Sequence, residues 1–178
     1  MPKRRSARRS GIARLGPALF KRLALCVFVL LFGTGSFFFL GGKVVLVHDG
    51  DTFTVLTERG ERKKIRLYGV DSPEWHQSGG QAAAQFARSL AFLEEVQISR
   101  VETDRYGRDV AILRLKNGRT LNEEMVKAGH AWVYTRYCDR PECVVWKGYE
   151  ATARKERRGL WKEARPIPPW RWRDNRNR

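Results

Sequence analysis

Cysteine and histidine are scarce in this chain, which has three of each among its 178 residues. Cys138 and Cys143 enclose the segment DRPE, but no second cysteine pair and no well-spaced histidine pair completes the four ligands of a structural zinc site. A zinc-stabilised domain is therefore not favoured. No internal repeat is visible, and the length suits one globular domain with extensions.

Acidic residues are also few and are unevenly placed. The chain holds 35 lysines and arginines against 19 aspartates and glutamates, which gives a formal net charge of +16. Residues 1–22 contain no acid and carry half of that net charge, so the rest of the chain is itself basic. A polyanion is the default partner of such a protein, either nucleic acid or an anionic membrane surface.

Residues 23–40, LALCVFVLLFGTGSFFFL, lack charge altogether. This run is close to the lower length limit for spanning a bilayer, so a signal anchor at 23–42 is the leading interpretation. Cleavage as a signal peptide is the alternative, because GTGS at 33–36 offers small residues to a signal peptidase. A buried core helix is disfavoured, since it would not need the preceding cations. In both leading cases the basic residues 1–22 stay in the cytoplasm, and the following domain lies in the periplasm or at the cell surface.

Alternating β-forming residues and turn signals predict five strands and three helices in a domain at 43–163. The strands are expected at 43–47, 52–57, 61–68, 96–103 and 109–115, and the helices at 79–95, 120–128 and 145–161. Three strands before the first helix are compatible with an α+β fold built on a small Greek-key barrel such as the OB-fold, although other α+β folds share the pattern. The basic, proline-rich residues 164–178 are expected to form a tail on or off the domain.

Two tight turns gather carboxylates. VHDGDTFTV at 47–55 has Asp51 directly after a turn glycine, and Asp71 ends the strand in IRLYGVDSPE at 65–74. Pro73 keeps Ser72 extended, which gives the Ser72 carbonyl a fixed direction. Two carboxylates, a carbonyl and waters form an oxygen-rich site suited to Ca²⁺ or Mg²⁺.

A glutamate and two arginines accompany these turns. Glu74 is close enough to Asp71 to touch a water near a metal, where a general base would act. Arg66 lies on the outward face of its strand and Arg108 follows a glycine turn, and guanidinium groups bind phosphate oxygens in pairs. Alone, each residue also fits a surface turn or ion pair. Together in a basic chain they favour phosphodiester hydrolysis, where cations offset the charge that grows on phosphorus.

Five segments, in this order, resemble the staphylococcal nuclease (thermonuclease) family: HDGDT (48–52), IRLYGVDSPE (65–74), DRYGR (104–108), LNEEMVKAGHAWVY (121–134) and ARKERRGLW (153–161). The resemblance implies an OB-fold barrel with three helices. It also implies a Ca²⁺-dependent nuclease that acts on DNA and RNA, expels the 5′-oxygen and leaves 3′-phosphate ends. Mg²⁺ is a less favoured cofactor.

The resemblance also assigns roles to the metal-site residues. Asp51 and Asp71 match the metal carboxylates of the family, and Ser72 matches a position, usually threonine, whose carbonyl binds the metal. Asp49 matches an acid behind these ligands.

Further roles come from the same resemblance. Glu74 matches the proposed general base, Arg66 and Arg108 match the phosphate-binding arginines, and Tyr106 matches an aromatic residue beside the bound nucleotide.

Other aromatic and sulfur-containing residues lie outside those motifs or depart from them. Tyr134 and Tyr137 are candidates for stacking on bases, and the WRWR tail at 170–173 for gripping nucleic acid or anionic lipid, with a solvated tail as the alternative. Cys138 and Cys143 sit where the type member has no cysteine. Placement outside the cytoplasm favours a disulfide between them over free thiols or zinc.

Three functions fit these observations: a membrane-anchored or secreted nuclease, a catalytically inactive OB-fold module that binds nucleic acid, and an envelope protein that binds anionic lipid. An inactive module would be expected to lack Asp51, Glu74 or an arginine. All of these are present, which favours the enzyme.

The charge distribution generates a topology prediction. We expect a reporter that is active only outside the cytoplasm to be active when fused after Arg178, because the N-terminal cations stay inside. An inactive reporter, with the domain protected inside intact spheroplasts, would contradict this topology.

Overall fold

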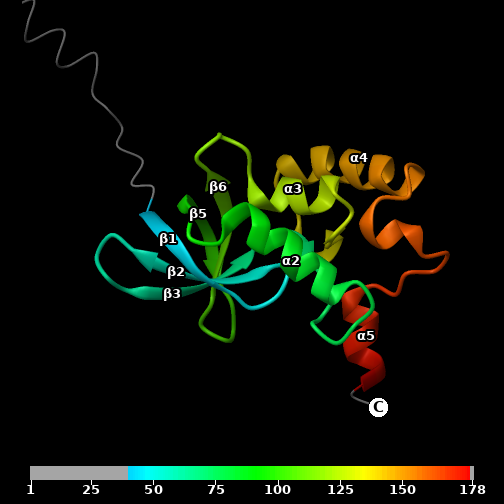
Figure 1. Cartoon of the computed structure of the whole chain (residues 1–178), viewed down its shortest axis with the longest axis horizontal. Helices are drawn as coiled ribbons and strands as arrows, with labels where there is room; N and C mark the ends of the chain where they lie inside the picture. Colours follow the sequence, from blue (N-terminus) through cyan, green and yellow to red (C-terminus); the bar gives the residue numbers. More distant parts are fainter. Residues whose placement is uncertain (1–39, 177–178) are drawn as a thin grey trace, which may run out of the picture. The chain divides into compact units, whose positions relative to one another are not determined.

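Five strands form a closed barrel, with the helices lying mostly to one side of it in Figure 1. The structure is a computed structural model that describes residues 40–176. The strand order is β1-β2-β3-β6-β5, with β5 pairing back to β1, and only the β3–β6 pair is parallel. The strands are β1 (Leu40–Val47), β2 (Thr52–Thr57), β3 (Arg62–Leu67), β5 (Glu95–Thr103) and β6 (Asp109–Leu115). The expected α+β fold with a five-stranded barrel of OB-fold type is thus confirmed.

Alternation along the strands fills the barrel. In β2, Phe53 and Val55 are fully buried, whereas Leu56 on the opposite face is exposed. In β3, Ile65 and Leu67 point into the core and leave Arg66 on the other face. The largest fully buried side chains come from the strands and from the helix that follows β6: Phe53, Ile65, Leu67, Leu113, Leu121 and Met125.

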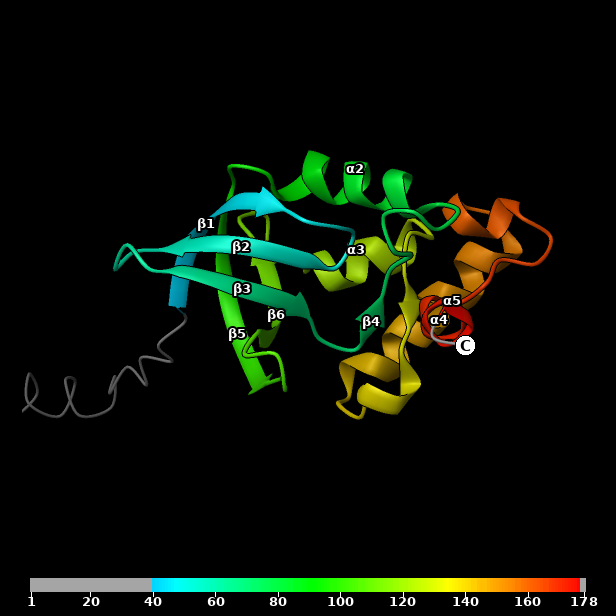
Figure 2. The same ribbon diagram turned by 90° about the horizontal axis from the view of Figure 1, so that it is seen from below.

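Three helices pack around the barrel near the predicted ranges, but the third ends at Lys155, six residues before the predicted end at 161. They are α2 (Gly80–Ala91), α3 (Leu121–Lys127) and α4 (Glu142–Lys155), and Figure 2 shows α2 and α3 close to the strands with α4 farther out. Buried alanines on α2 let its backbone approach the core closely. The Thr120 side chain caps α3 by accepting a hydrogen bond from the Glu123 backbone N–H.

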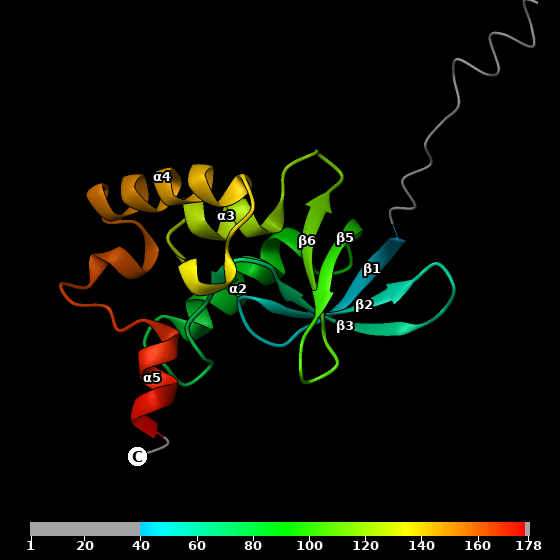
Figure 3. The same cartoon turned by 180° about the vertical axis from the view of Figure 1, so that it is seen from behind.

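The C-terminal segment departs from the expected tail. It contains a 3₁₀ turn η2 (Gly159–Lys162) and a further helix, α5 (Pro169–Arg176), seen from behind in Figure 3. Proline is well suited to the first position of a helix, where its missing N–H is not needed. Trp170 packs on a second small apolar cluster made by Trp132, Ala153, Leu160 and Trp161. Residues 169–176 therefore pack on the domain, which is one of the two placements expected for the tail, and they form a helix that the sequence did not predict.

The chain also enters the barrel earlier than expected. β1 begins at Leu40, so residues 40–42, assigned from sequence to the end of the signal anchor, belong to the barrel. The remainder of that predicted anchor, residues 23–39, lies outside the described residues. None of the helices within 40–176 is long and apolar enough to cross a membrane.

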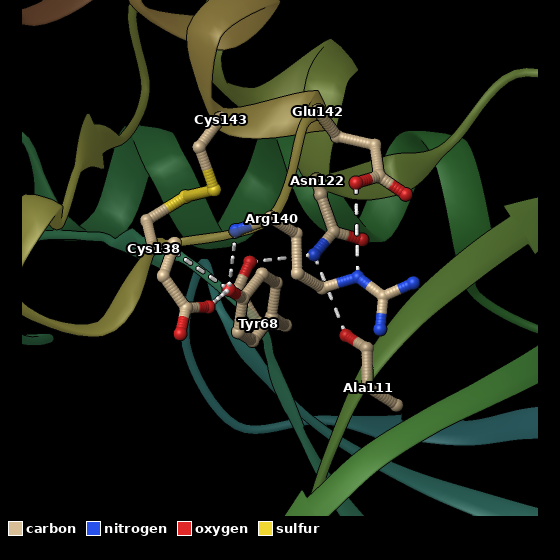
Figure 4. The surroundings of a disulfide bond; sticks show 8 residues. Tyr68, Ala111, Asn122, Cys138, Arg140, Glu142 and Cys143 are labelled. Atoms are coloured by element: carbon tan, nitrogen blue, oxygen red, sulfur yellow. Dashed lines mark hydrogen bonds and ion pairs between the residues drawn. A yellow bond between two sulfur atoms is a disulfide. The ribbon is translucent and has the colours of Figure 1, made fainter.

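A disulfide joins Cys138 to Cys143 at the start of α4, with their Cα atoms 5.7 Å apart (Figure 4). The loop that it closes wraps around the buried Tyr68. The Tyr68 hydroxyl donates to the Asp139 carboxylate at 2.6 Å and accepts from the Asp139 backbone N–H at 3.0 Å. A Cβ on Gly69 would lie 2.4 Å from the Cys138 sulfur, so the bridged loop needs glycine at this position, where φ is +69°.

The small loop sets a limit on what the disulfide contributes. Closing about six residues should stabilise the protein by ~2 kcal/mol on chain-entropy grounds. We expect reduction to lower the melting temperature by about 5–10 °C without abolishing activity. In a Cys138→Ser/Cys143→Ser variant the reductant should change nothing. Two alkylatable thiols at these positions in the oxidised protein would contradict the bond.

Candidate active site

The turn between β1 and β2 holds Asp51 against the end of β3. The strand register pairs Thr52 with Arg66, and the Leu67 N–H donates to the Asp51 carbonyl at 2.8 Å. Asp49 fixes the turn, because its Oδ1 accepts the Asp51 N–H at 2.9 Å. Gly50 allows the turn to close, since a Cβ there would lie 2.5 Å from the Ser72 hydroxyl. Asp51 is consequently only 2% exposed.

Asp71 is placed by a short two-stranded sheet that the sequence did not predict. β4 (Val70–Asp71) pairs antiparallel with β7 (Trp132–Val133), which opposes Asp71 to Trp132. Asp71 is fully buried. The Ser72 N–H donates to Asp51 Oδ2 at 2.8 Å, which ties the two acid-bearing turns together.

Arg66 bridges the two aspartates. Its Nη1 donates to Asp51 Oδ1 at 2.7 Å, and its Nη2 donates to Asp71 Oδ1 at the same distance. Arg66 therefore points away from the core, as predicted, and its guanidinium contacts the two aspartates.

Several carboxylates lie near Arg66. Burial, and then the neighbouring Asp51 charge, raises the pKa of Asp49 to about 7. The same two causes raise the pKa of Asp71 above its ordinary value. Glu74 adds a further carboxylate, and we call Asp49, Asp51, Asp71 and Glu74 the acid cluster. A cation bound here would relieve the repulsion between these groups.

Glu74 is held by the loop that leads into α2. Its backbone N–H donates to the Gln77 side chain at 3.2 Å, and its carbonyl accepts the Gln77 N–H at 2.8 Å. Gly80 lets the loop fold back, because a Cβ there would lie 1.9 Å from the Glu74 carbonyl oxygen. The Glu74 carboxylate is 37% exposed, so water can reach it while the aspartates stay buried.

Arg173 of α5 also enters the site, and sequence reasoning missed it. Its Nη2 donates to Asp71 Oδ2 at 2.7 Å, and its Nη1 donates to Asp71 Oδ1 at 3.2 Å and to Glu74 Oε1 at 2.7 Å. The only signal was the density of tryptophan and arginine in the tail, which indicates an interaction but not its location.

Arg108 and Tyr106 lie apart from the acid cluster in the described structure. Arg108 Nε donates to Asp104 Oδ2 at 2.7 Å, and no contact joins it to the cluster within residues 40–176. Its position is nevertheless adjacent, because the next residue, Asp109, pairs with Ile65 across the parallel β3–β6 ladder. Tyr106 is 68% exposed, and the Arg105 and Arg108 guanidiniums lie over its ring.

The two other predicted stacking residues differ in their surroundings. Tyr137, in the 3₁₀ turn η1 (Thr135–Tyr137), is exposed and lies edge-on to Tyr134 at 4.9 Å between ring centroids. Tyr134 instead has a ring face covered by Trp170, at 4.9 Å and nearly parallel.

The acid cluster fits a hard divalent cation. In the described part of the chain no three side chains of His, Cys, Asp or Glu come together as a ready-made metal site. The candidate ligands are two buried carboxylates, Asp51 and Asp71, and the carbonyl of Ser72, all of them the oxygen donors that Ca²⁺ prefers. Within residues 40–176 the buried Ser72 hydroxyl has no hydrogen-bond partner. A further oxygen that could bond a ligand or its water therefore lies beside these carboxylates.

The barrel and the acid cluster at its edge agree with the family that the comparisons identify. The family model described as "Staphylococcal nuclease homologue" matches residues 64–163, more than half of the chain. The chain belongs to the staphylococcal nuclease family and is a nuclease of that type, which confirms the resemblance drawn from its motifs.

Two of three similar curated relatives are named as nucleases, in agreement with this assignment. An "Uncharacterized endonuclease" of Escherichia coli O157:H7 is 39% identical over 132 residues, covering 74% of this chain and 84% of the relative. A "Micrococcal nuclease" of Shigella flexneri is 39% identical over 140 residues, covering 74% and 79%. A "Protein ParB" of Escherichia coli is 33% identical over 164 residues, covering 88% and 92%.

The position of Arg66 generates a stability prediction. Arg66→Ala should destabilise the metal-free protein by about 3–5 kcal/mol, because it removes the cation that hydrogen-bonds two buried carboxylates, Asp51 and Asp71. Arg100, whose exposed side chain pairs with Asp109 at 3.4 Å, is the matched control, and Arg100→Ala should cost less than about 1 kcal/mol. Denaturant unfolding measures both. Equal effects for the two variants would contradict the bridging role.

Proposed function

We propose that the protein is a Ca²⁺-dependent endonuclease that hydrolyses phosphodiester bonds of DNA and RNA and leaves 3′-phosphate ends. The observation that carries this proposal is the Arg66 guanidinium held between Asp51 and Asp71, with Glu74 three residues farther along the same loop. A relative named micrococcal nuclease supports the same activity.

Asp51, Asp71 and the Ser72 carbonyl are the residues that would hold Ca²⁺. The bound ion would offset negative charge on the phosphate as the reaction proceeds. Asp49 takes no direct part, and it orients the turn through its hydrogen bond to the Asp51 N–H. Mg²⁺ suits this set less well, because it demands near-octahedral geometry and keeps its waters.

Glu74 acts as the general base. It accepts a proton from a water molecule as the water oxygen forms a bond to phosphorus, and the bond from phosphorus to the 5′-oxygen breaks. The 5′-oxygen leaves with a proton taken from solvent, and the phosphate stays on the 3′-oxygen of the other fragment. The exposure of the Glu74 carboxylate suits a group that must meet water.

Arg66 and Arg108 bind the non-bridging phosphate oxygens. Arg66 can turn one nitrogen toward the phosphate while the other keeps an aspartate. Arg108 must exchange its bonds to Asp104 for bonds to phosphate. Both then stabilise the charge that develops on the pentacoordinate phosphorus.

The residues that would contact the substrate suit the phosphate backbone and the faces of the bases, and not a particular nucleotide sequence. Contacts to phosphate carry no base information. Tyr106, Tyr134 and Tyr137 offer rings on which any base can stack, with either sugar. The surplus of positive charge attracts the polyanion.

We further propose that the nuclease domain works outside the cytoplasm, anchored by residues 23–42 or released after their cleavage. The disulfide between Cys138 and Cys143 supports this location, because such bonds persist in oxidising compartments. No obligate protein partner is required by the proposed chemistry.

The mechanism predicts a specific loss in Glu74→Gln. This change preserves shape and hydrogen bonding but removes the base, so the cleavage rate with Ca²⁺ should fall by about 10²–10⁴-fold, while binding of DNA changes little. Cleavage of single-stranded DNA and of RNA, with Ca²⁺, with Mg²⁺ or with chelator, is the measurement.

Glu61→Gln provides the control. Glu61 is an exposed glutamate at the start of β3, paired with Lys63 at 3.9 Å, and its variant should cleave like wild type. Activity of Glu74→Gln within about threefold of wild type would overturn the assigned base. Unmodified protein that binds both polymers and cleaves neither with any of the metals would favour an inactive nucleic-acid-binding module.

A further inference from the structure

Helix α5 lies beside the loop before α2 in both Figure 1 and Figure 3. Contacts far apart in sequence hold it there. The Gln77 side-chain amide donates to the Ile167 carbonyl at 2.6 Å, and Ser78 hydrogen-bonds Glu163. Pro169 is buried at the first turn of the helix. The segment before α5 is therefore fastened to the same loop that carries Glu74.

Arg173 hydrogen-bonds the Asp71 carboxylate oxygens that would bind the proposed metal. Asp71 Oδ2 accepts from Arg173, and Asp71 Oδ1 accepts from both Arg173 and Arg66. A cation bound to Asp71 would lie beside the Arg173 guanidinium, and like charges at such separations repel strongly in a partly buried site. Arg173 and a divalent cation thus compete for Asp71.

The same guanidinium restrains Glu74. Arg173 Nη1 donates to Glu74 Oε1 at 2.7 Å. The Glu74 oxygen that accepts this bond is occupied by the guanidinium, so it is not free to accept a hydrogen bond from the attacking water. The contact that opposes metal binding therefore also opposes the action of the general base.

Trp170, one turn earlier on α5, occupies a second part of the site. Its ring stacks on Tyr134 at 4.9 Å with an interplanar angle of 3°, the arrangement that a nucleobase would take on the same tyrosine. A base cannot stack on this face of Tyr134 while Trp170 covers it. Arg173 thus blocks the metal ligand Asp71, and Trp170 blocks the stacking face of Tyr134. The two blocking residues are three apart and lie on the same side of α5.

We propose that α5 is an intramolecular competitor for the active site, in which Arg173 opposes the divalent cation and Trp170 opposes a base of the nucleic acid. The proposal rests on the proposed function. Binding of the cation and of single-stranded nucleic acid then displaces α5, and the nuclease is fully active only when both are present. An exposed basic helix released in this way would also add positive charge beside the bound polyanion.

The test compares two full-length variants in detergent solution. Arg173→Ala removes the competing cation, and Arg171→Ala is the matched control, because Arg171 lies on the same helix, is exposed, and has no ion pair within the described residues. Calorimetric titration with Ca²⁺ alone measures affinity without relying on catalysis. We expect Arg173→Ala to bind Ca²⁺ about tenfold more tightly than wild type, and Arg171→Ala to match wild type.

Amide hydrogen exchange supplies a second readout. In wild type, adding Ca²⁺ and a hydrolysis-resistant single-stranded oligonucleotide analogue should accelerate exchange over residues 169–176, because α5 leaves the site. Trp170→Ala should bind the same oligonucleotide more tightly in the presence of chelator, whereas Trp172→Ala should not.

Each result bears on the proposal. Equal Ca²⁺ affinity for Arg173→Ala and wild type, with exchange at 169–176 unchanged by ligands, would overturn it while leaving the nuclease function intact. Lower activity in Arg173→Ala at unchanged Ca²⁺ affinity would overturn it in favour of a third phosphate-binding arginine. Wild-type protein that neither binds Ca²⁺ nor cleaves nucleic acid would overturn the proposed function as well.

Discussion

One guanidinium between two buried carboxylates is the interaction on which the site depends. Arg66 can reach both Asp51 and Asp71 only because β2 and β3 are paired in one register. Shifting that register by one residue would turn Arg66 into the core and Ile65 out of it. Burying two carboxylates without a cation would cost folding free energy, and Arg66 offsets that cost. The barrel and the turns in return bring the aspartates to Arg66, so each part depends on the others.

The local parts of this arrangement could be read from the sequence, because turns and strand alternation act over a few residues. The DGD turn and the end of IRLYGVDSPE gave Asp51, Asp71 and Glu74, and alternation within 61–68 turned Arg66 away from the core. The barrel itself followed from the number and spacing of strands together with a family resemblance. The β4–β7 pair escaped notice because two-residue strands have no periodicity to detect.

The parts that sequence reasoning could not place depend on contacts between distant segments. Arg173 meets Asp71 across 102 residues, and no local rule predicts where a short proline-rich segment will dock. Arg108 is bonded to Asp104, four residues away, and its contact with phosphate stays a prediction. Local composition therefore identified the groups that carry charge, but not the partner that each one selects.

Closure of the barrel has a consequence for how the protein acquires its site. β1 must pair with β5, and β3 must pair with β6, so the barrel is sealed by contacts between residues some tens of positions apart. Folds rich in such non-local contacts have high contact order, and they form on timescales of about milliseconds to seconds because loop entropy is lost before the contacts compensate for it. Within the site, the contacts of Arg66 with Asp51 and Asp71 span only 15 and 5 residues, whereas the contact of Arg173 with Asp71 spans 102. A chain that is still emerging from the ribosome therefore has both acid-bearing turns before it has the C-terminal helix that contacts them.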